Sequence, residues 1–280
     1  MANGHWTNGA ADRDIGTAGN WSGGATPGAN ESAYFIADVA NTNSQYPNTG
    51  MADLTAIDLN LLQILDGYAQ PIGGSSNHFT ITADKIVHNG SGTLWWKDGT
   101  AAAVSDALVV ETGRGNPVSE SIIHCQIGNA ATLSDLFALR GKAVVESGST
   151  VTNITVGRLN HTILDAFCTI DAGATISTLV EVMGGLLRSD SAIPTLKAFG
   201  GTTWQGTAAF TTLYVFPGAR VNLTFGGTVA TTVHHFGGVI DGTKGGGLKT
   251  IGTYFRYFNN EDENNVMVGD QGIITCTARQ

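Results

Sequence analysis

The chain has 280 residues, of which 42% are apolar, enough to bury a core, so a simply disordered chain is excluded. Only 13% are charged, against about 25% in typical proteins, while 38 residues are glycine, and this balance favours an all-β fold with many turns. The formal net charge of −9, with 14 Lys and Arg, lacks the clustered positive charge that nucleic acids and anionic membranes require, so we expect neither as a partner.

The first 50 residues lack the repeat found further along, and we expect them to form an irregular cap or attachment segment. Residues 5–35 read HWTNGAADRDIGTAGNWSGGATPGANESAYF. This stretch resembles the opening of many bacterial and phage β-helix proteins, in which one Trp is followed by a second in an Asn-Trp-x-x-Gly-x-x-Pro context. The matching residues are Trp6, Asn20, Trp21, Gly24, Pro27, Asn30, Glu31, Tyr34 and Phe35. The Asp that usually precedes the strand is replaced here by Asn30-Glu31.

The resemblance implies an architecture rather than an activity, because surface adhesins, autotransporter passengers and virion proteins all use such modules. We interpret Trp6 and Trp21 as covering the apolar end of a coil stack, since two large rings in a Gly-rich segment can do this without regular hairpins. The alternative role for these rings is a sugar-stacking platform, which requires them to be exposed.

Residues 54–130 alternate apolar and polar positions between turns, as expected of less regular coils. Trp95 and Trp96 lie together in the segment GTLWWKDGT. Because successive strand residues point to opposite faces, one ring should be inside and the other outside. The outer ring is a candidate for a subunit contact.

From residue 133 onward, apolar residues spaced three apart recur every 17 to 25 positions. The groups are Leu133/Leu136/Leu139, Val151/Ile154, Ile176/Leu179/Val182, Ile193/Leu196/Phe199, Phe210/Leu213/Phe216, Ala230/Val233/Phe236 and Leu248/Ile251/Tyr254. Gly-bearing turns follow four of them. Gly pairs and Pro194 disfavour helices here, and the repeat is too short for a helical hairpin.

The repeat therefore predicts an all-β, single-domain, right-handed parallel β-helix, a β-solenoid whose apolar side chains point inward and stack on the next coil. We place its coils at residues 51–257. The preceding residues 1–50 form the cap, and residues 258–280 form a C-terminal tail or second cap.

A catalytic site on such a fold needs carboxylates gathered on one face. The candidate acids fall in different phases of the repeat; these are Asp165, Asp171, Asp190 and Asp241. Arginines near equivalent turns have no acidic partner in phase; these are Arg140, Arg158 and Arg188. No nucleophile motif or P-loop is present. We therefore predict no catalytic residue and no cofactor, and expect a protein that is not an enzyme.

Metal sites are not indicated either. His234 and His235 are adjacent and should point to opposite faces, so they cannot bind one ion together. The other histidines show no ligand spacing; these are His5, His78, His88, His124 and His161. Three widely spaced cysteines, Cys125, Cys168 and Cys276, form neither a zinc motif nor a disulfide framework.

We see neither a secretory signal nor an apolar run of about 18 residues that could span a bilayer. The leading hypothesis is a structural phage virion protein, a capsid decoration or head–tail accessory protein. It would bind the major capsid protein or another virion protein, and we expect it to self-assemble as a homotrimer in the virion. The alternatives are a tailspike-like polysaccharide-binding or polysaccharide-degrading protein, and a bacterial surface adhesin.

Overall fold

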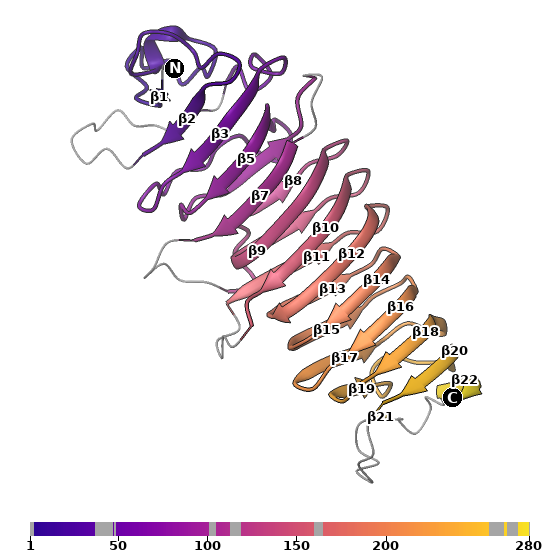
Figure 1. The fold of residues 1–280 in the computed structure, drawn as a ribbon. Helices are drawn as coiled ribbons and strands as arrows, with labels where there is room; N and C mark the ends of the chain where they lie inside the picture. The colour runs from indigo at the N-terminus through magenta and orange to yellow at the C-terminus, as the bar shows by residue number, and fades with distance from the viewer. Residues whose placement is uncertain are drawn as a thin grey trace. The chain divides into compact units, whose positions relative to one another are not determined.

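The computed structural model describes residues 3–36, 47, 49–100, 105–112, 119–159, 165–257, 266–267 and 274–279, with backbone only for Asn3 and the last two ranges. The chain divides into two compact units, Met1–Thr150 and Val151–Gln280. Within the described residues both units consist almost entirely of parallel strands, so the all-β parallel β-helix expected from the sequence is confirmed (Figure 1). His161 and most of the predicted tail lie outside the described ranges.

The first unit is built from two parallel sheets. Its elements are β1 (Asn3–His5), the short 3-10 helix η1 (Ala18–Asn20), β2 (Ser32–Phe35), β3 (Asp58–Ile64), β4 (Phe79–Thr80), β5 (Thr82–His88), β6 (Leu94–Lys97), β7 (Ser105–Glu111), β8 (Cys125–Ile127) and β9 (Thr132–Val145). One sheet runs β1–β2–β3–β5–β7–β9. The other, the short-strand sheet, runs β4–β6–β8 and ends on the last residues of β9.

The N-terminal segment takes part in this pairing. β1 and β2 pair in parallel with one another, and β2 pairs with β3. Two strands within the predicted cap, β1 and β2, thus extend the longer sheet, while the residues between them form turns and η1. The division of the chain into cap, coils and tail remains a prediction.

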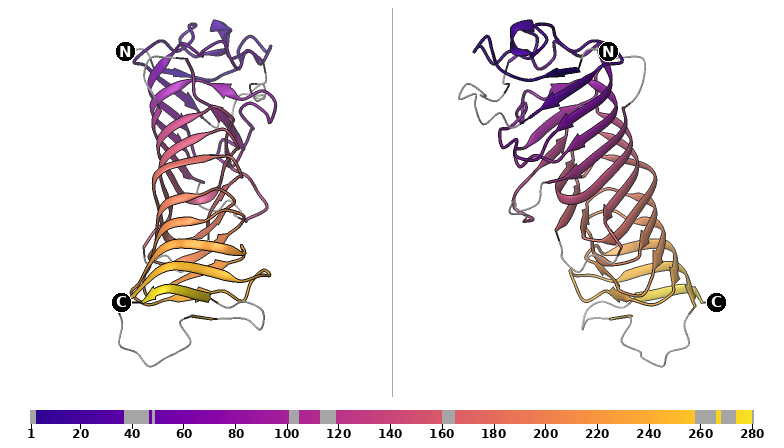
Figure 2. Two further views of the ribbon diagram at one scale, coloured as in Figure 1. Left: turned by 90° about the vertical axis from the view of Figure 1, so that its right-hand side faces the viewer. Right: turned by 60° about the vertical axis from the view of Figure 1, so that its left-hand side comes forward.

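The second unit repeats the same plan with greater regularity. Its strands are β10 (Thr150–Gly157), β11 (Ala166–Ile170), β12 (Thr175–Gly184), β13 (Leu186–Ser189), β14 (Ile193–Ala198), β15 (Gly201–Gln205), β16 (Phe210–Val215), β17 (Ala219–Leu223), β18 (Gly227–His235), β19 (Val239–Asp241), β20 (Lys249–Arg256), β21 (Val266–Met267) and β22 (Ile274–Arg279). From β11 on, each strand pairs with the strand two further along the chain, which produces an even sheet (β12 to β22) and an odd sheet (β11 to β21). Figure 2 shows from two further sides how the chain passes from one sheet to the other and back.

The core of the second unit consists of columns of apolar side chains running from coil to coil. One column contains Ile193, Phe210, Ala230 and Ile251, and a second contains Leu196, Leu213 and Val233. All of these side chains are at most 1% exposed. Apolar residues at equivalent positions of successive coils therefore stack on one another, as the repeat predicted, and their burial stabilises the unit.

The structure corrects the third member of four repeated groups, those that end in Leu139, Phe199, Phe216 and Phe236. In the group Ile176/Leu179/Val182 the third member is inward as predicted, and the second inward residue is Val180 instead of Leu179. After the second inward residue the strand continues in ordinary alternation, so the next inward residue comes two positions later, not three. Ala198, Val215 and His235 hold that inward place and are buried. The aromatic residue that follows each of them faces outward. The last group was also placed out of register, since Ile251 and not Leu248 pairs with Ala230, and Leu248 is 51% exposed.

A buried histidine of the first unit makes its stability depend on pH. The Nε2 atom of His88 lies 2.9 Å from the carbonyl oxygens of Gly92 and His124, while its buried Nδ1 has no hydrogen-bond partner among the described residues. A protonated imidazole would leave that second N–H unsatisfied. Burial accordingly lowers the pKa of His88 to about 4.

We expect acid to destabilise the protein through this residue. In the unfolded chain a histidine has a pKa near 6.5, so between pH 6.5 and 4 the unfolded state binds more protons than the folded state. Stability is fully present above pH 6.5, falls as the pH drops toward 4, and loses about 3 kcal/mol in total from His88. The measurement is the unfolding free energy from urea titrations between pH 7.5 and 4.5.

The control is His88→Gln, which removes the titrating group while retaining a donor. Burial also lowers the pKa of His78, His124 and His235, so the variant should keep part of the pH dependence. An unchanged slope in His88→Gln would contradict the assignment.

Candidate functional site

Trp6 and Trp21 lie inside a cluster of aromatic rings in the first unit. Each is 2% exposed, and their ring centroids are 5.6 Å apart in an edge-to-face arrangement. Both also pack against Phe35. The indole N–H of Trp21 donates a hydrogen bond of 2.9 Å to the carbonyl of Ile15. Buried rings whose polar atom is already bonded cannot serve as a sugar platform, so these residues pack the core near the N-terminus.

Trp95 and Trp96 point to opposite faces of β6, as alternation predicts. Trp96 is fully buried and its indole N–H donates to the carbonyl of Ile81 at 2.9 Å. Trp95 is half-buried on the outer face, in register with Gln126 of β8. Of the two, only Trp95 is available for contact with a partner.

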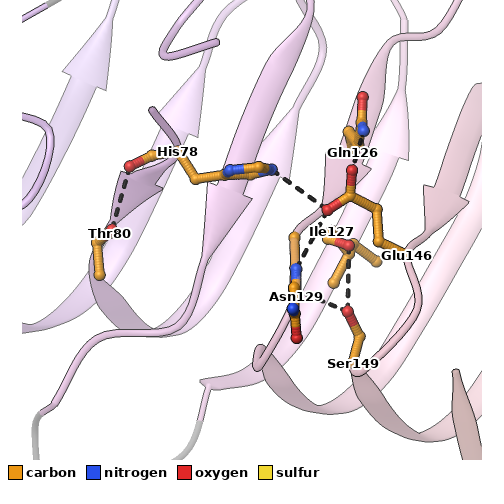
Figure 3. Close-up of polar contacts among 8 residues, drawn as sticks. His78, Thr80, Gln126, Ile127, Asn129, Glu146 and Ser149 are labelled. Atoms are coloured by element: carbon orange, nitrogen blue, oxygen red, sulfur yellow. Dashed lines mark hydrogen bonds and ion pairs between the residues drawn. The ribbon is translucent and has the colours of Figure 1, made fainter. Parts of the chain in front are cut away.

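A polar cluster lies at the edge of the short-strand sheet (Figure 3). His78 precedes β4, Gln126 is on β8, Asn129 is in the turn after β8, and Glu146 follows β9. In the register of this sheet Phe79 pairs with Trp96 and Trp96 pairs with Ile127, so His78 and Gln126 come to the same level although they are far apart in sequence. The Glu146 carboxylate accepts hydrogen bonds from the Gln126 amide and, at 3.1 Å, from the main-chain N–H of Asn129.

The imidazole of His78 completes this cluster. Its Nε2 lies 3.5 Å from Oε2 of Glu146. Burial lowers the pKa of His78, the Glu146 carboxylate opposes that shift, and Lys97 adds to it. A Cβ at residue 128 would lie 2.5 Å from Cδ2 of His78, so the imidazole can reach Glu146 only because that residue is glycine.

The geometry of this cluster suits bracing rather than catalysis. The nearby Ser149 hydroxyl is directed at the carbonyl oxygens of Ile127 and Gly128, at 3.2 and 2.7 Å, and not at the imidazole (Figure 3). A nucleophile must be hydrogen-bonded to its base, which is not the arrangement of Ser149 and His78. The cluster therefore connects the segment before β4 with the turns that follow β8 and β9.

A second charged pair, which the sequence analysis did not identify, lies on the odd sheet. Arg220 of β17 donates to the carboxylate of Asp241 on β19 and, from Nε, to Oδ1 of Asn222 at 3.1 Å. The other oxygen of Asp241 accepts from the N–H and hydroxyl of Thr243. Burial acts to raise the pKa of Asp241, but these hydrogen bonds outweigh it and lower the pKa. A carboxylate engaged on both oxygens is held in place rather than poised as a base.

The other candidate ligands do not assemble into a site. His235 is buried and bonded to the Tyr254 hydroxyl at 2.6 Å, whereas His234 lies on the outer face, as expected of neighbours in a strand. Within the part of the chain that the structure describes, no three His, Cys, Asp or Glu residues are grouped so that they could hold a metal ion. Cys125 and Cys168 are buried free thiols, and burial raises the pKa of Cys125.

The most distinctive surface is on the outer side of the even sheet. Two columns of rings run across its coils, and we call them together the aromatic face. Its members are Phe199, Phe216, Phe236 and Tyr257 in the corner column, and Tyr214, His234 and Phe255 in the strand column. Tyr257 is 52% exposed and the other rings are half-buried.

The rings of each column stack face to face along the coil direction. In the corner column the centroids are 4.5, 4.9 and 4.4 Å apart, with interplanar angles of 12°, 5° and 8°. In the strand column the separations are 4.7 and 4.9 Å, both at 8°. Both faces of each inner ring are thus covered by neighbouring rings. The aromatic face consequently presents ring edges to the outside.

The columns of the aromatic face contain no Asp, Glu, Lys or Arg over the three coils of β16, β18 and β20. Beside the rings, a third outward column consists of Thr212, Thr232 and Thr253 in direct register. Arg256 of β20 is in register with the buried His235 but is itself exposed, between Phe255 and Tyr257, at the last of these coils. The nearest charges continuing the strand column are Lys197 and Glu181, which form an ion pair at 3.3 Å. An apolar patch of this kind is typical of a protein-binding surface.

None of the described residues forms a helix that is long and apolar enough to cross a membrane. Comparison of the chain with protein-family models, with curated proteins and with solved structures gives no match in any of the three.

Proposed function

We propose that this protein is a passive structural component of a bacteriophage particle, a capsid decoration or head–tail accessory protein that binds the major capsid protein or another virion protein. The placement on a virion draws on the resemblance of residues 5–35 to the opening of phage β-helix proteins. The passive role draws on the aromatic face.

The aromatic face supports protein binding over the alternatives. A protein that binds polysaccharide through aromatic residues needs an open ring face against which a sugar can stack. Here the inner rings Phe216, Phe236 and His234 are each stacked on both sides. Ring edges beside a column of threonines instead form a surface with few charges that another protein can cover, with gain of buried apolar area.

The two charged clusters fit the same role. In the first unit Glu146 is bonded to Gln126 and Asn129, and in the second Asp241 is bonded to Arg220 and Thr243. Each joins one coil to another. These contacts between coils stiffen the protein. A protein that binds the assembled shell, and not the free shell subunits, stabilises the shell by mass action.

The test is co-sedimentation of the purified chain with capsid shells that lack it, and separately with insoluble cell-wall glycan. We expect saturable binding to shells and none to glycan. Thr232→Asp should reduce shell binding by at least tenfold, because it places a charge within the aromatic face. The matched control is Trp204→Ser, which alters a half-exposed aromatic residue of the odd sheet. Binding to glycan, or equal shell binding by Thr232→Asp, would contradict the proposal.

A further inference from the structure

We infer that the aromatic face binds a second copy of this chain, so that the protein self-associates through the outer side of its even sheet. This inference rests on the proposed function in one respect: it takes the aromatic face to be the protein-binding surface. In the isolated chain a second copy covers this surface, and in the particle the virion protein takes the place of that copy.

The charge distribution favours a second copy. Each chain carries a net charge of −9, so two copies repel one another over most of their surfaces. The outward columns of β16, β18 and β20 hold threonine, tyrosine, phenylalanine and one histidine, His234, and they contain no Asp, Glu, Lys or Arg. Two copies that meet here bring together surfaces with few charges and keep their acidic surfaces apart.

The spacing of the rows also favours a second copy. Within each column one side chain follows the next once per coil, at the distance of about 4.8 Å between paired strands. A second copy presents ridges and grooves with the same period. A column of rings from the second copy can therefore lie in the groove between the strand column and the corner column of the first copy, with one contact at every coil. A partner whose side chains repeat at another distance would make such a contact at a single coil.

The size of the aromatic face sets the strength of the contact. Four coils extend over roughly 19 Å, and the strand segment from the threonine column to the corner column over roughly 17 Å, which gives about 320 Å² per copy. A standard stable interface buries about 800 Å² per partner. We therefore expect weak association that depends on protein concentration, with dissociation in the micromolar range or above.

The experiment measures the weight-average mass of the isolated chain by light scattering and sedimentation velocity from about 5 to 500 μM. The expected result for the wild type is a concentration-dependent rise of this mass from that of one chain toward twice that value. Thr232→Asp, which leaves both ring stacks intact, should stay at the mass of one chain over the whole range. Trp204→Ser should associate as the wild type does. A wild type that stays monomeric, or a Thr232→Asp variant that associates equally well, would overturn the inference.

Disulfide trapping places the contact on this surface. In Thr232→Cys the new thiol lies in the centre of the threonine column, and mild oxidation should produce a covalent dimer. Wild-type protein controls for Cys125 and Cys168, which are buried, and for Cys276. The readout is a covalent dimer on non-reducing gels, several-fold above the wild-type background. The absence of that increase would count against the inference.

Failure of this inference can be told apart from failure of the proposed function. A chain that stays monomeric at all concentrations but co-sediments with shells keeps the function and loses the second copy. A chain that self-associates through Thr232 but ignores shells keeps the second copy and loses the virion role.

Discussion

Gly201→Ala is expected to destabilise the second unit by about 3–5 kcal/mol. Gly201 begins β15 with φ +69°, a left-handed conformation that costs other residues about 1–2 kcal/mol. An added Cβ would also lie 2.5 Å from the main-chain nitrogen of Gly185 and closer still to its carbonyl oxygen. That carbonyl accepts the hydrogen bond from Thr202 at 2.8 Å, so the two coils cannot separate without losing it.

Alanine variants at two other glycines of the same unit distinguish backbone strain from the steric contact of the added Cβ. Gly218 has φ +92°, but an added Cβ would meet its nearest neighbour only at 3.7 Å, so Gly218→Ala should cost about 1–2 kcal/mol from backbone strain alone. At Gly246 nothing lies within 4 Å, and alanine there should be nearly neutral. The measurement is the urea midpoint of unfolding followed by circular dichroism. Equal losses in Gly201→Ala and Gly218→Ala would show that the close approach of the coils is not the cause.

Trp96→Ala is the second change for which we expect a large loss of stability, about 3–5 kcal/mol. The Trp96 side chain is fully buried on the inner face of β6. Its removal leaves a cavity and a carbonyl of Ile81 that has lost its hydrogen-bond donor. The neighbouring Trp95→Ala removes the same atoms from the half-buried outer face and should cost about 1 kcal/mol.

Comparing the two variants tests which face of β6 each indole ring occupies. Both variants are compared by urea denaturation with circular dichroism as the signal, because fluorescence would change with the loss of either indole. If Trp95→Ala proved as costly as Trp96→Ala, the outer ring would be packed against something beyond the described residues.

The sequence by itself determined the class of fold and the spacing of the coils. Strand-forming residues, Gly-bearing turns and apolar groups that recur every coil are local features, and each coil repeats the environment of the one before it. For the same reason, alternation along a single strand was enough to assign opposite faces to Trp95 and Trp96, and to His234 and His235. The first two positions of most apolar groups, such as Ile193 and Leu196, were likewise placed inward correctly; the exceptions are Leu179 and Leu248.

Only the tertiary structure decided which residue of each coil comes third on the inside, and what meets across coils. The spacing of three ends after the second inward residue, and a change of one position sends Phe199, Phe216 and Phe236 to the outer face, where they stack as the aromatic face. The pairs His78–Glu146 and Arg220–Asp241 depend on the register between coils of unequal length. That register is set by turns and by the packing of the whole stack, so no local pattern in the chain contains it.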